Sequence, residues 1–141
     1  MKKPQLSATV ITLYPELFPG PLSASVTGRA LEKKIWSLET IDLRVYGKGK
    51  HKQVDDKPIS GGPGMVLRPD VLDRALLQAS HFVSNTKKLI VCMSPKGIPF
   101  TQNTAKNLLK YNEMIIVCGR FEGIDQRVIE KHHMKEISIG D

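Results

Sequence analysis

Two short apolar runs, each followed closely by a glycine, constrain the fold of this chain more than any other feature. The first covers residues 89–93 (Leu-Ile-Val-Cys-Met), and Gly97 comes shortly after it. The second covers residues 114–118 (Met-Ile-Ile-Val-Cys) and stops at Gly119. Apolar runs of this length without polar alternation are typical of strands that are buried on both faces of a parallel sheet. The pattern therefore predicts two buried parallel strands.

The segment between these runs has the features of a helix. Thr101 is a plausible N-cap, and Ala105, Leu108 and Leu109 form an apolar stripe with helical spacing. A strand, a helix and a second strand at this spacing form a βαβ unit, whose crossover is right-handed in almost all proteins. We therefore expect an α/β fold with a mostly parallel sheet flanked by helices.

The loops after the two strands are candidates for a ligand site. Open α/β sheets bind ligands in the crevice outside the carboxyl ends of their strands. The alternative is that each glycine only permits a tight turn, and neither loop contains the G-x-G-x-x-G pattern of a dinucleotide site. The residues placed at this edge are Ser94, Pro95, Gly97, Gly119, Arg120 and Glu122.

The charge of the chain favours a polyanionic partner. Its 141 residues include 21 Lys and Arg against 14 Asp and Glu, which gives a net charge of +7. A basic surface most often indicates a nucleic acid. Much of the positive charge lies in residues 44–57, where lysines alternate with Gly47 and Gly49 as in loops that follow phosphates. The alternative for this segment is a solvated loop without a partner.

The remaining bulk properties indicate one globular domain in the cytoplasm. The length suits a single core, and no apolar run approaches the roughly 20 residues that a membrane helix needs. The apolar run at 8–13 is too short for the core of a signal peptide. Cys92 and Cys118 lie in the predicted strands and begin no C-x-x-C pair, so we expect small buried side chains without zinc or redox chemistry.

Further elements are predicted around the βαβ unit. Residues 54–65 contain three glycines and two prolines, so we expect them to lack regular structure. His132 and His133 are expected to end a helix. We expect strands at 8–13 and 36–46, helices that start at Pro15, at Pro69 and with Thr27 as a cap, a helix containing Ile124, Val128 and Ile129, and a strand from Ile137.

Six motifs in order carry a resemblance to a known family. They lie at 26–30 (Val-Thr-Gly-Arg-Ala), 54–58 (Val-Asp-Asp-Lys-Pro), 61–65 (Gly-Gly-Pro-Gly-Met), 89–97, 117–125 (Val-Cys-Gly-Arg-Phe-Glu-Gly-Ile-Asp) and 138–141 (Ser-Ile-Gly-Asp). Together they closely resemble the bacterial tRNA (guanine-N1)-methyltransferases of the SPOUT class. The likeness runs from about residue 8 to the end of the sequence.

The resemblance implies a trefoil-knotted α/β fold that binds S-adenosylmethionine in the knot. It also implies methyl transfer to N1 of the guanosine 3′-adjacent to the anticodon of tRNA, and a homodimer whose active sites are shared between subunits. The positions that match the family's cofactor pocket are Met93, Ser94, Pro95, Gly97, Gly119, Phe121, Glu122, Gly123, Ser138, Ile139 and Gly140. Those that match its RNA-facing loops are Arg29, Asp55, Asp56, Gly61, Gly62, Pro63 and Gly64.

Several of these positions have more than one physical interpretation. Glu122 would stabilise the positively charged sulfonium of the cofactor, or it would pair with Arg120 or Arg127. The aspartates at 55–56 would hold Mg²⁺ or recognise a base, or they would only balance nearby lysines. The glycines at 61–64 would hold a phosphate or a base edge, or they would form a plain turn.

The resemblance also implies residues that this sequence does not contain. Family members continue past the position of Asp141 into a helical C-terminal domain, and the proposed general base, an aspartate, and its assisting arginine lie there. The catalytic residues are therefore expected beyond Asp141 and stay unassigned, and the knot would be incomplete in a chain that ended at Asp141. Residues 1–141 would then be the cofactor-binding domain, inactive by itself.

Two other functions were weighed against methyl transfer. The alternative function is a non-catalytic RNA-binding module on the same α/β core. A phosphate-handling hydrolase that uses the glycines at 61–64 is disfavoured, because the sequence contains no P-loop.

Overall fold

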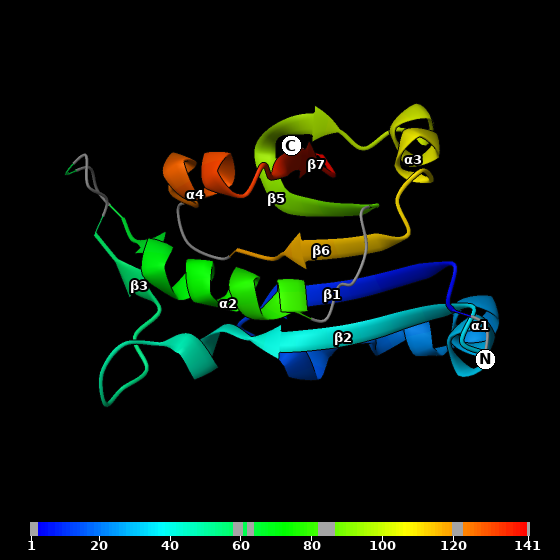
Figure 1. The fold of residues 1–141 in the computed structure, drawn as a ribbon, viewed down its shortest axis with the longest axis horizontal. Helices are drawn as coiled ribbons and strands as arrows, with labels where there is room; N and C mark the ends of the chain where they lie inside the picture. Colours follow the sequence, from blue (N-terminus) through cyan, green and yellow to red (C-terminus); the bar gives the residue numbers. More distant parts are fainter. Residues whose placement is uncertain (1–2, 58–60, 62–63, 82–86, 120–122, 141) are drawn as a thin grey trace.

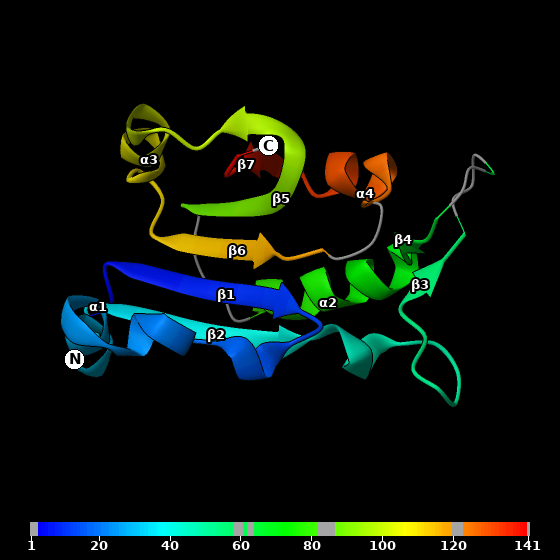
Figure 2. The ribbon, with the colours of Figure 1, turned by 180° about the vertical axis from the view of Figure 1, so that it is seen from behind.

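The computed structural model describes residues 3–57, 61, 64–81, 87–119 and 123–140, without the side chain of His81. Five parallel strands form one sheet in the order β2-β1-β6-β5-β7. Figures 1 and 2 show the arrows of β1, β2 and β6 pointing toward the same end of the molecule, whereas β5 starts in the same direction and then curves back. The strands are β1 (Leu6–Thr12), β2 (Trp36–Asp42), β5 (Lys88–Pro99), β6 (Glu113–Val117) and β7 (Lys135–Ser138). The expected α/β fold with a mostly parallel sheet is therefore confirmed.

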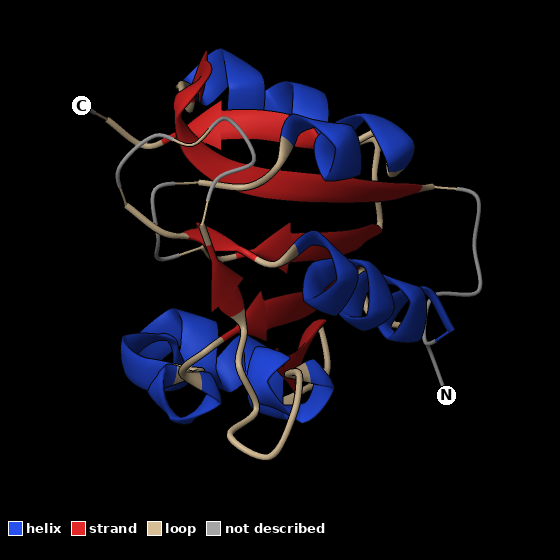
Figure 3. Cartoon of the chain, turned by 90° about the vertical axis from the view of Figure 1, so that its left-hand side faces the viewer, coloured by secondary structure: helices blue, strands red, loops and turns tan. Residues whose placement is uncertain are grey.

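Helices lie on both sides of the strands (Figure 3). Within the described ranges, no helix is long and apolar enough to cross a membrane. The α-helices are α1 (Ser25–Glu32), α2 (Pro69–His81), α3 (Gln102–Leu108) and α4 (Gln126–Lys131). Three short 3-10 helices are η1 (Pro15–Leu17), η2 (Gly20–Ser23) and η3 (Leu43–Tyr46), and two short strands, β3 (Asp55–Asp56) and β4 (Val66–Leu67), form a separate antiparallel pair.

The alternation of side chains along β5 divides the core into two parts. Ile90 and Cys92 point into the larger cluster, which includes the buried faces of α2 and α4. Leu89 and Val91 point to the opposite face, where Leu108 of α3 packs against them. Successive side chains of a strand face opposite sides of the sheet, so β5 is buried on both faces as its apolar sequence predicts. The expected buried face of α2 is also confirmed: Leu72, Ala75, Leu76 and Ala79 are at most 1% exposed.

The βαβ unit is present, but its first strand is longer than expected. The segment at 94–97 is not a loop after the strand, because β5 continues to Pro99 and curves around β7 (Figures 1 and 2). Ile137 pairs with both Met93 and Ile98, so the residues between them form a bulge. Thr101 is confirmed as the N-cap of α3, whereas Leu109 is 81% exposed and lies outside the helix.

Two other expected boundaries are wrong for local reasons. The strand predicted at 36–46 ends at Asp42, whose carboxylate accepts a hydrogen bond from the backbone N–H of Arg44 and caps η3. Thr27 does not cap α1, which begins at Ser25 with Ala24 as its N-cap. Thr27 lies inside the helix, and its hydroxyl donates to the carbonyl of Ala24 at 3.0 Å.

The segment predicted to lack regular structure contains a strand. β3 pairs antiparallel with β4, in the register Asp55 with Leu67 and Asp56 with Val66. We call this pair the β3–β4 hairpin. Its backbone is also held by the N–H of Arg68, which donates to the carbonyl of Val54 at 2.7 Å. The glycines and prolines occupy the connection between the two strands and leave the pairing residues outside it.

Candidate functional site

The loops predicted to bind a cofactor meet at the carboxyl edge of the sheet. Cys92 pairs with Val117, so Ser94 and Gly119, each two residues further on, extend from neighbouring strands. On the other side of β5, Pro99 pairs with Ser138 at the end of β7. The bulge of β5, the end of β6 and the end of β7 therefore form one continuous edge, as the sequence predicted.

Gly97 allows β5 to pass close to β7. A Cβ atom at this position would lie 2.5 Å from the backbone carbon of Glu136 and from the backbone nitrogen of Ile137. Real Cβ atoms do not approach backbone atoms so closely, so only glycine fits. The sequence assigned Gly97 to the cofactor pocket, and the structure adds a packing reason for a glycine at this position.

Gly119 has the opposite environment. It is exposed, and the nearest atoms to an added Cβ are those of the Ile124 side chain at 3.9 Å. Among the residues that the structure describes, space is therefore left beside Gly119. Gly123 and Gly140 have φ angles of 145° and 138°, a conformation that side chains of L-residues rarely adopt.

The end of β7 has a local polar turn. The hydroxyl of Ser138 donates to the carbonyl of Gly140 and accepts from its N–H, both at 3.2 Å. In the bulge of β5, the hydroxyl of Ser94 accepts from the N–H of Lys96 at 3.2 Å. Ser138 is buried, whereas Ile139 is 82% exposed. These turns present backbone groups at the edge where the cofactor is expected.

An apolar cavity of about 580 Å³ lies along the α3 face of the sheet and extends from this edge to the amino ends of the strands, where Gln5 and Leu6 line it. Two predicted cofactor residues, Met93 and Ile139, line it, together with Phe100 and Leu108 from around α3. A volume of this size is typical of sites for small organic ligands. Sequence reasoning did not select the α3 residues for a site, because their helical spacing indicates only a buried face.

Some residues selected from the sequence lie outside the described residues: Gly62, Pro63, Arg120, Phe121, Glu122 and Asp141. Because Asp141 is among them, the path of the chain at this point and the trefoil knot that the resemblance implies stay predictions. The same holds for the expectation that the catalytic residues lie beyond Asp141. The roles expected of Phe121 and Glu122 at the cofactor are likewise untested by the geometry.

One of the alternative partners expected for Glu122 is already engaged. The guanidinium of Arg127 binds the carboxylate of Asp125 at 2.8 and 3.1 Å. This contact stabilises the ionised carboxylate and lowers the pKa of Asp125. A pair between Glu122 and Arg127 would therefore have to compete with Asp125.

The β3–β4 hairpin lies beside the cofactor edge. The backbone N–H of Leu67 in β4 donates to the carbonyl of Gly123 at 3.3 Å, and Leu67 also forms an isolated parallel bridge with Ile124. The aspartates at 55–56, expected to face RNA, and the segment at 123–124, expected to hold the cofactor, are thus attached to the same short strand pair. Gly61 and Gly64, in the connection of the hairpin, are exposed.

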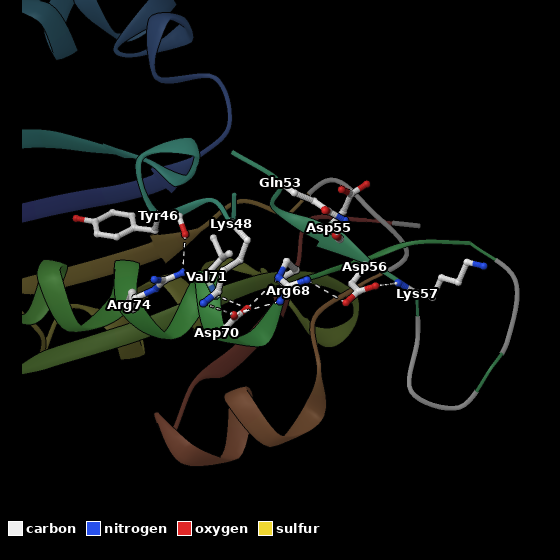
Figure 4. A network of polar contacts seen from close by, with 10 residues as sticks. All are labelled: Tyr46, Lys48, Gln53, Asp55, Asp56, Lys57, Arg68, Asp70, Val71 and Arg74. Carbon is white, nitrogen blue, oxygen red and sulfur yellow. Dashed lines mark hydrogen bonds and ion pairs between the residues drawn. The ribbon is translucent and has the colours of Figure 1, made fainter. Parts of the chain in front are cut away.

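Arg68 is the centre of a polar network that sequence reasoning missed. Its guanidinium binds the carboxylates of Asp56 and Asp70, each at 3.1 Å (Figure 4). Lys48 binds Asp70 as well, at 3.2 Å. Asp56 also accepts from the N–H of Lys57 at 2.8 Å. The network fastens the hairpin and the basic segment to the start of α2. Asp55 has no hydrogen-bond or ion-pair partner for its carboxylate among the described residues.

The network changes the acidity of Asp70. Hydrogen bonds from Arg68, supported by Lys48, stabilise the ionised carboxylate and lower the pKa of Asp70 to about 2. A second carboxylate with a lowered pKa is that of Asp73 in α2. It accepts from His132 at 2.7 Å and from Lys131 at 3.0 Å, so it joins α2 to α4.

The basic segment at 44–57 is a turn closed by hydrogen bonds. Lys48 and Gln53 exchange two backbone hydrogen bonds of 2.8 Å each, which leaves residues 49–52 at the exposed tip. Arg44 is directed elsewhere: it donates to the carbonyl of Leu13 at 2.7 Å. The exposed lysines at 50, 52 and 57 therefore remain for a partner, whereas Lys48 is held by Asp70.

Arg29 is not brought together with the other residues expected to face RNA. It is exposed on α1, and Figures 1 and 2 show α1 at the end of the molecule opposite the β3–β4 hairpin. Within one chain, Arg29 and the aspartates at 55–56 cannot contact the same nucleotide.

The two thiols have the properties of packing residues. Cys92 is 2% exposed, and burial raises its pKa to about 11. Cys118, directly after β6, is half-buried, and burial raises its pKa as well. Thiolates are the reactive form, so neither thiol is suited to act as a nucleophile near neutral pH. In the part of the chain that the structure describes, no three His, Cys, Asp or Glu side chains converge as a metal site.

Glycine-bearing segments lie at the carboxyl edge of a parallel α/β sheet, where such folds bind ligands, and a basic turn precedes the β3–β4 hairpin beside this edge. Comparison with known proteins identifies the family. A profile of the family tRNA (Guanine-1)-methyltransferase TrmD matches residues 6–141, and the chain belongs to this family.

Curated relatives agree with this assignment. The chain is 53% identical over 136 residues to a protein named tRNA (guanine-N(1)-)-methyltransferase from Jannaschia sp. (strain CCS1), a match that covers 95% of this chain and 55% of the relative. A protein of the same name from Ehrlichia canis (strain Jake) is 48% identical, and the match covers 96% of this chain and 57% of the relative. Another from Zymomonas mobilis subsp. mobilis is 49% identical, and the match covers 100% of this chain and 55% of the relative. The chain therefore spans little more than half the length of these relatives.

Proposed function

We propose that this chain is the cofactor-binding part of an enzyme that transfers a methyl group from S-adenosylmethionine to N1 of the guanosine 3′-adjacent to the anticodon in tRNA. The observation that carries the proposal is the contact between Leu67 and Gly123. It joins the hairpin expected to face RNA to the segment expected to hold the cofactor. A methyl donor and a base bound at these two places would be neighbours, as transfer requires.

The residues at the carboxyl edge fit the proposed cofactor. The open space beside Gly119 admits a flat ring, and the turns at Ser94 and Ser138 offer polar groups at its edge. The apolar cavity at Met93 adjoins them. When bound, S-adenosylmethionine supplies an electrophilic methyl group on a positively charged sulfur. We propose that the carboxylate of Glu122 stabilises that charge.

The RNA would be held by charge and oriented by the hairpin. Lys50 and Lys57 are exposed and would contact phosphates. Asp56 is neutralised by Arg68, so we propose Asp55 as the carboxylate that recognises the base or binds Mg²⁺. Mg²⁺ is commonly held by one or two carboxylates together with water and phosphate oxygens, so one free carboxylate beside RNA is sufficient.

We further propose that the enzyme acts as a homodimer in the cytoplasm, with Arg29 serving the active site of the opposite subunit. The separation of Arg29 from the hairpin within one chain supports this arrangement. The apolar side chains around α1 also support a dimer, because Leu17, Leu22 and Val26 are 65%, 45% and 67% exposed. N1 of guanine carries a proton at neutral pH, so the reaction needs a general base, and we assign this role to none of the described residues.

The cofactor site is tested by calorimetric titration with S-adenosylmethionine. The wild-type chain should bind the cofactor, and Gly119→Val should abolish binding, because the branched side chain fills the open space. Among the described residues, an added Cβ meets no atom closer than 3.9 Å, so we expect the variant to fold. Circular dichroism of the variant serves as the control. Equal affinity in both proteins would contradict the site. No binding by the wild-type chain would instead favour the alternative, a non-catalytic RNA-binding module.

A further inference from the structure

The amino ends of the strands carry lysines that the proposed site does not use. Hydrogen bonds hold the segments before four adjacent strands side by side. Gln5 donates to the carbonyl of Ile35 at 2.8 Å, Ser7 to Asn112 at 2.8 Å, and Asn112 to Lys87 at 3.1 Å. We call the lysines of these segments the lysine edge: Lys3, Lys33, Lys34, Lys87, Lys88 and Lys110.

The lysine edge has little opposing charge. Five of its lysines are exposed and Lys88 is half-buried. Among the described residues, none of them forms an ion pair. The only acidic side chains in the same segments are Glu32, which is exposed, and Glu113, which is half-buried. Topology assembles this charge from parts of the sequence that lie more than 100 residues apart, so no local run of lysines reveals it.

The position of the lysine edge separates it from the proposed active site. In Figure 1 it lies at the right-hand end of the sheet, where α1 and the N-terminus are, whereas the β3–β4 hairpin lies at the left-hand end. Strands of five to seven residues separate the two ends, which corresponds to about 17–23 Å at a rise of about 3.3 Å per residue. A small anion cannot contact both ends, but a large folded RNA can.

The shape of the lysine edge suits a phosphate backbone. Four adjacent strands about 4.8 Å apart span about 14 Å, which is long enough to contact successive phosphates of one RNA strand. Lysines bind phosphates as mobile point charges and need no fixed geometry. A symmetric contact of the lysine edge with itself would place the same positive charges against each other, so the homodimer proposed above would use the apolar side chains around α1 and leave these lysines for RNA.

We propose that the lysine edge is a second RNA-binding surface, which contacts phosphates of the bound tRNA away from the methylated base. This inference rests on tRNA as the substrate. The surface neutralises phosphates and releases their counterions, so it contributes affinity and salt dependence without selecting the sequence. Its contribution adds to that of the basic turn at 49–52.

The test measures binding of an unmodified tRNA transcript at several salt concentrations. Lys33→Gln combined with Lys87→Gln removes two charges from the lysine edge, and both side chains are exposed. The matched control is Arg127→Gln combined with Lys131→Gln, which removes two charges from α4. For the lysine-edge variant, the slope of log affinity against log salt should become shallower by about 1.4–1.8, at about 0.7–0.9 per contact. The control should retain the wild-type slope.

The outcomes separate this inference from the proposed function. An unchanged slope in the lysine-edge variant, or an equal change in the control, would overturn the second surface. A changed sedimentation coefficient without a changed slope would also overturn it and assign the lysine edge to a protein contact. The affinity for S-adenosylmethionine, measured by calorimetry in the lysine-edge variant, should not change. Failure of the wild-type chain to bind the cofactor would contradict the proposed methyl transfer but leave the salt slopes interpretable.

Discussion

Two glycines at the same edge of the sheet are needed for different reasons. At Gly97 an added Cβ would collide with the backbone of β7, whereas at Gly119 it would enter open space. A packing constraint and a proposed ligand site therefore lie on neighbouring strands. Sequence alone treats both glycines as parts of one pocket, because both follow an apolar strand.

This difference predicts that alanine destabilises the fold at position 97 but hardly changes its stability at position 119. Gly97→Ala should lower the free energy of unfolding by about 1–3 kcal/mol, the usual cost of overpacking, because β5 must move away from Glu136 and Ile137. Gly119→Ala should change it by less than about 0.5 kcal/mol. Urea unfolding followed by circular dichroism measures both. If the two variants lose similar stability, the close approach of β5 and β7 is wrong.

At the scale of elements, the molecule joins the β3–β4 hairpin to α2 through charge. Arg68 binds a carboxylate from each element, and Lys48 adds the basic turn to the same group. The hairpin has only two residues in each strand, so its own pairing cannot fix its direction. We infer that the network holds the aspartates at 55–56 in place beside the segment at 123–124.

The network predicts a specific response to acid. The pKa of Asp70 is about 2 in the folded chain and 3.8 ordinarily. Its stabilising effect is therefore complete above about pH 4 and is lost as the pH falls toward 2. Asp70→Asn should lower stability at pH 7 by roughly 0.5–1 kcal/mol, a small value because the side chain is 41% exposed. The variant should also show a weaker loss of stability between pH 4 and 2.

Urea midpoints at pH 7, 4 and 2.5 measure this dependence. Asp55→Asn is the matched control, because the carboxylate of Asp55 has no partner among the described residues, and its stability should follow the wild-type curve. A wild-type pH profile in Asp70→Asn would show that the ion pairs with Arg68 and Lys48 do not stabilise the fold.

At the scale of the whole molecule, we propose different functions for the two ends of the sheet. The carboxyl ends are proposed to bring cofactor and base together, and the amino ends to hold RNA by charge alone. The relatives are nearly twice as long as this chain. From the family resemblance, the proposed general base is expected beyond the position that matches Asp141.

We therefore expect a polypeptide of these 141 residues to methylate tRNA at no more than a trace rate. A general base typically contributes about 10²–10⁴-fold, and loss of positioning lowers the rate further. Transfer of radiolabelled methyl groups to unmodified tRNA, measured beside the full-length relative from Jannaschia sp., provides the comparison. Comparable rates would show that the catalytic residues lie within the present chain.

The sequence by itself determined the features that depend on local spacing. Apolar runs and helical stripes predicted the βαβ unit and the buried face of α2, since periodicity reports which side of an element is covered. Because parallel strands share a direction, the sequence also predicted that Ser94 and Gly119 lie at one edge, whereas Ser138 was assigned to the same site only by the family resemblance. The thiols at 92 and 118 were predicted to be inert because they follow apolar neighbours.

Only the tertiary structure decided what depends on strand order and on contacts between distant residues. The bulge at 94–97 exists because β5 curves around β7. The first residue of β7, Lys135, comes 36 residues after Pro99, the last residue of β5. The ion pairs of Arg68, the separation of Arg29 from the hairpin and the assembly of the lysine edge have the same origin. Each arises from the spatial neighbours of a residue, and local spacing carries no information about neighbours that the fold brings from elsewhere in the chain.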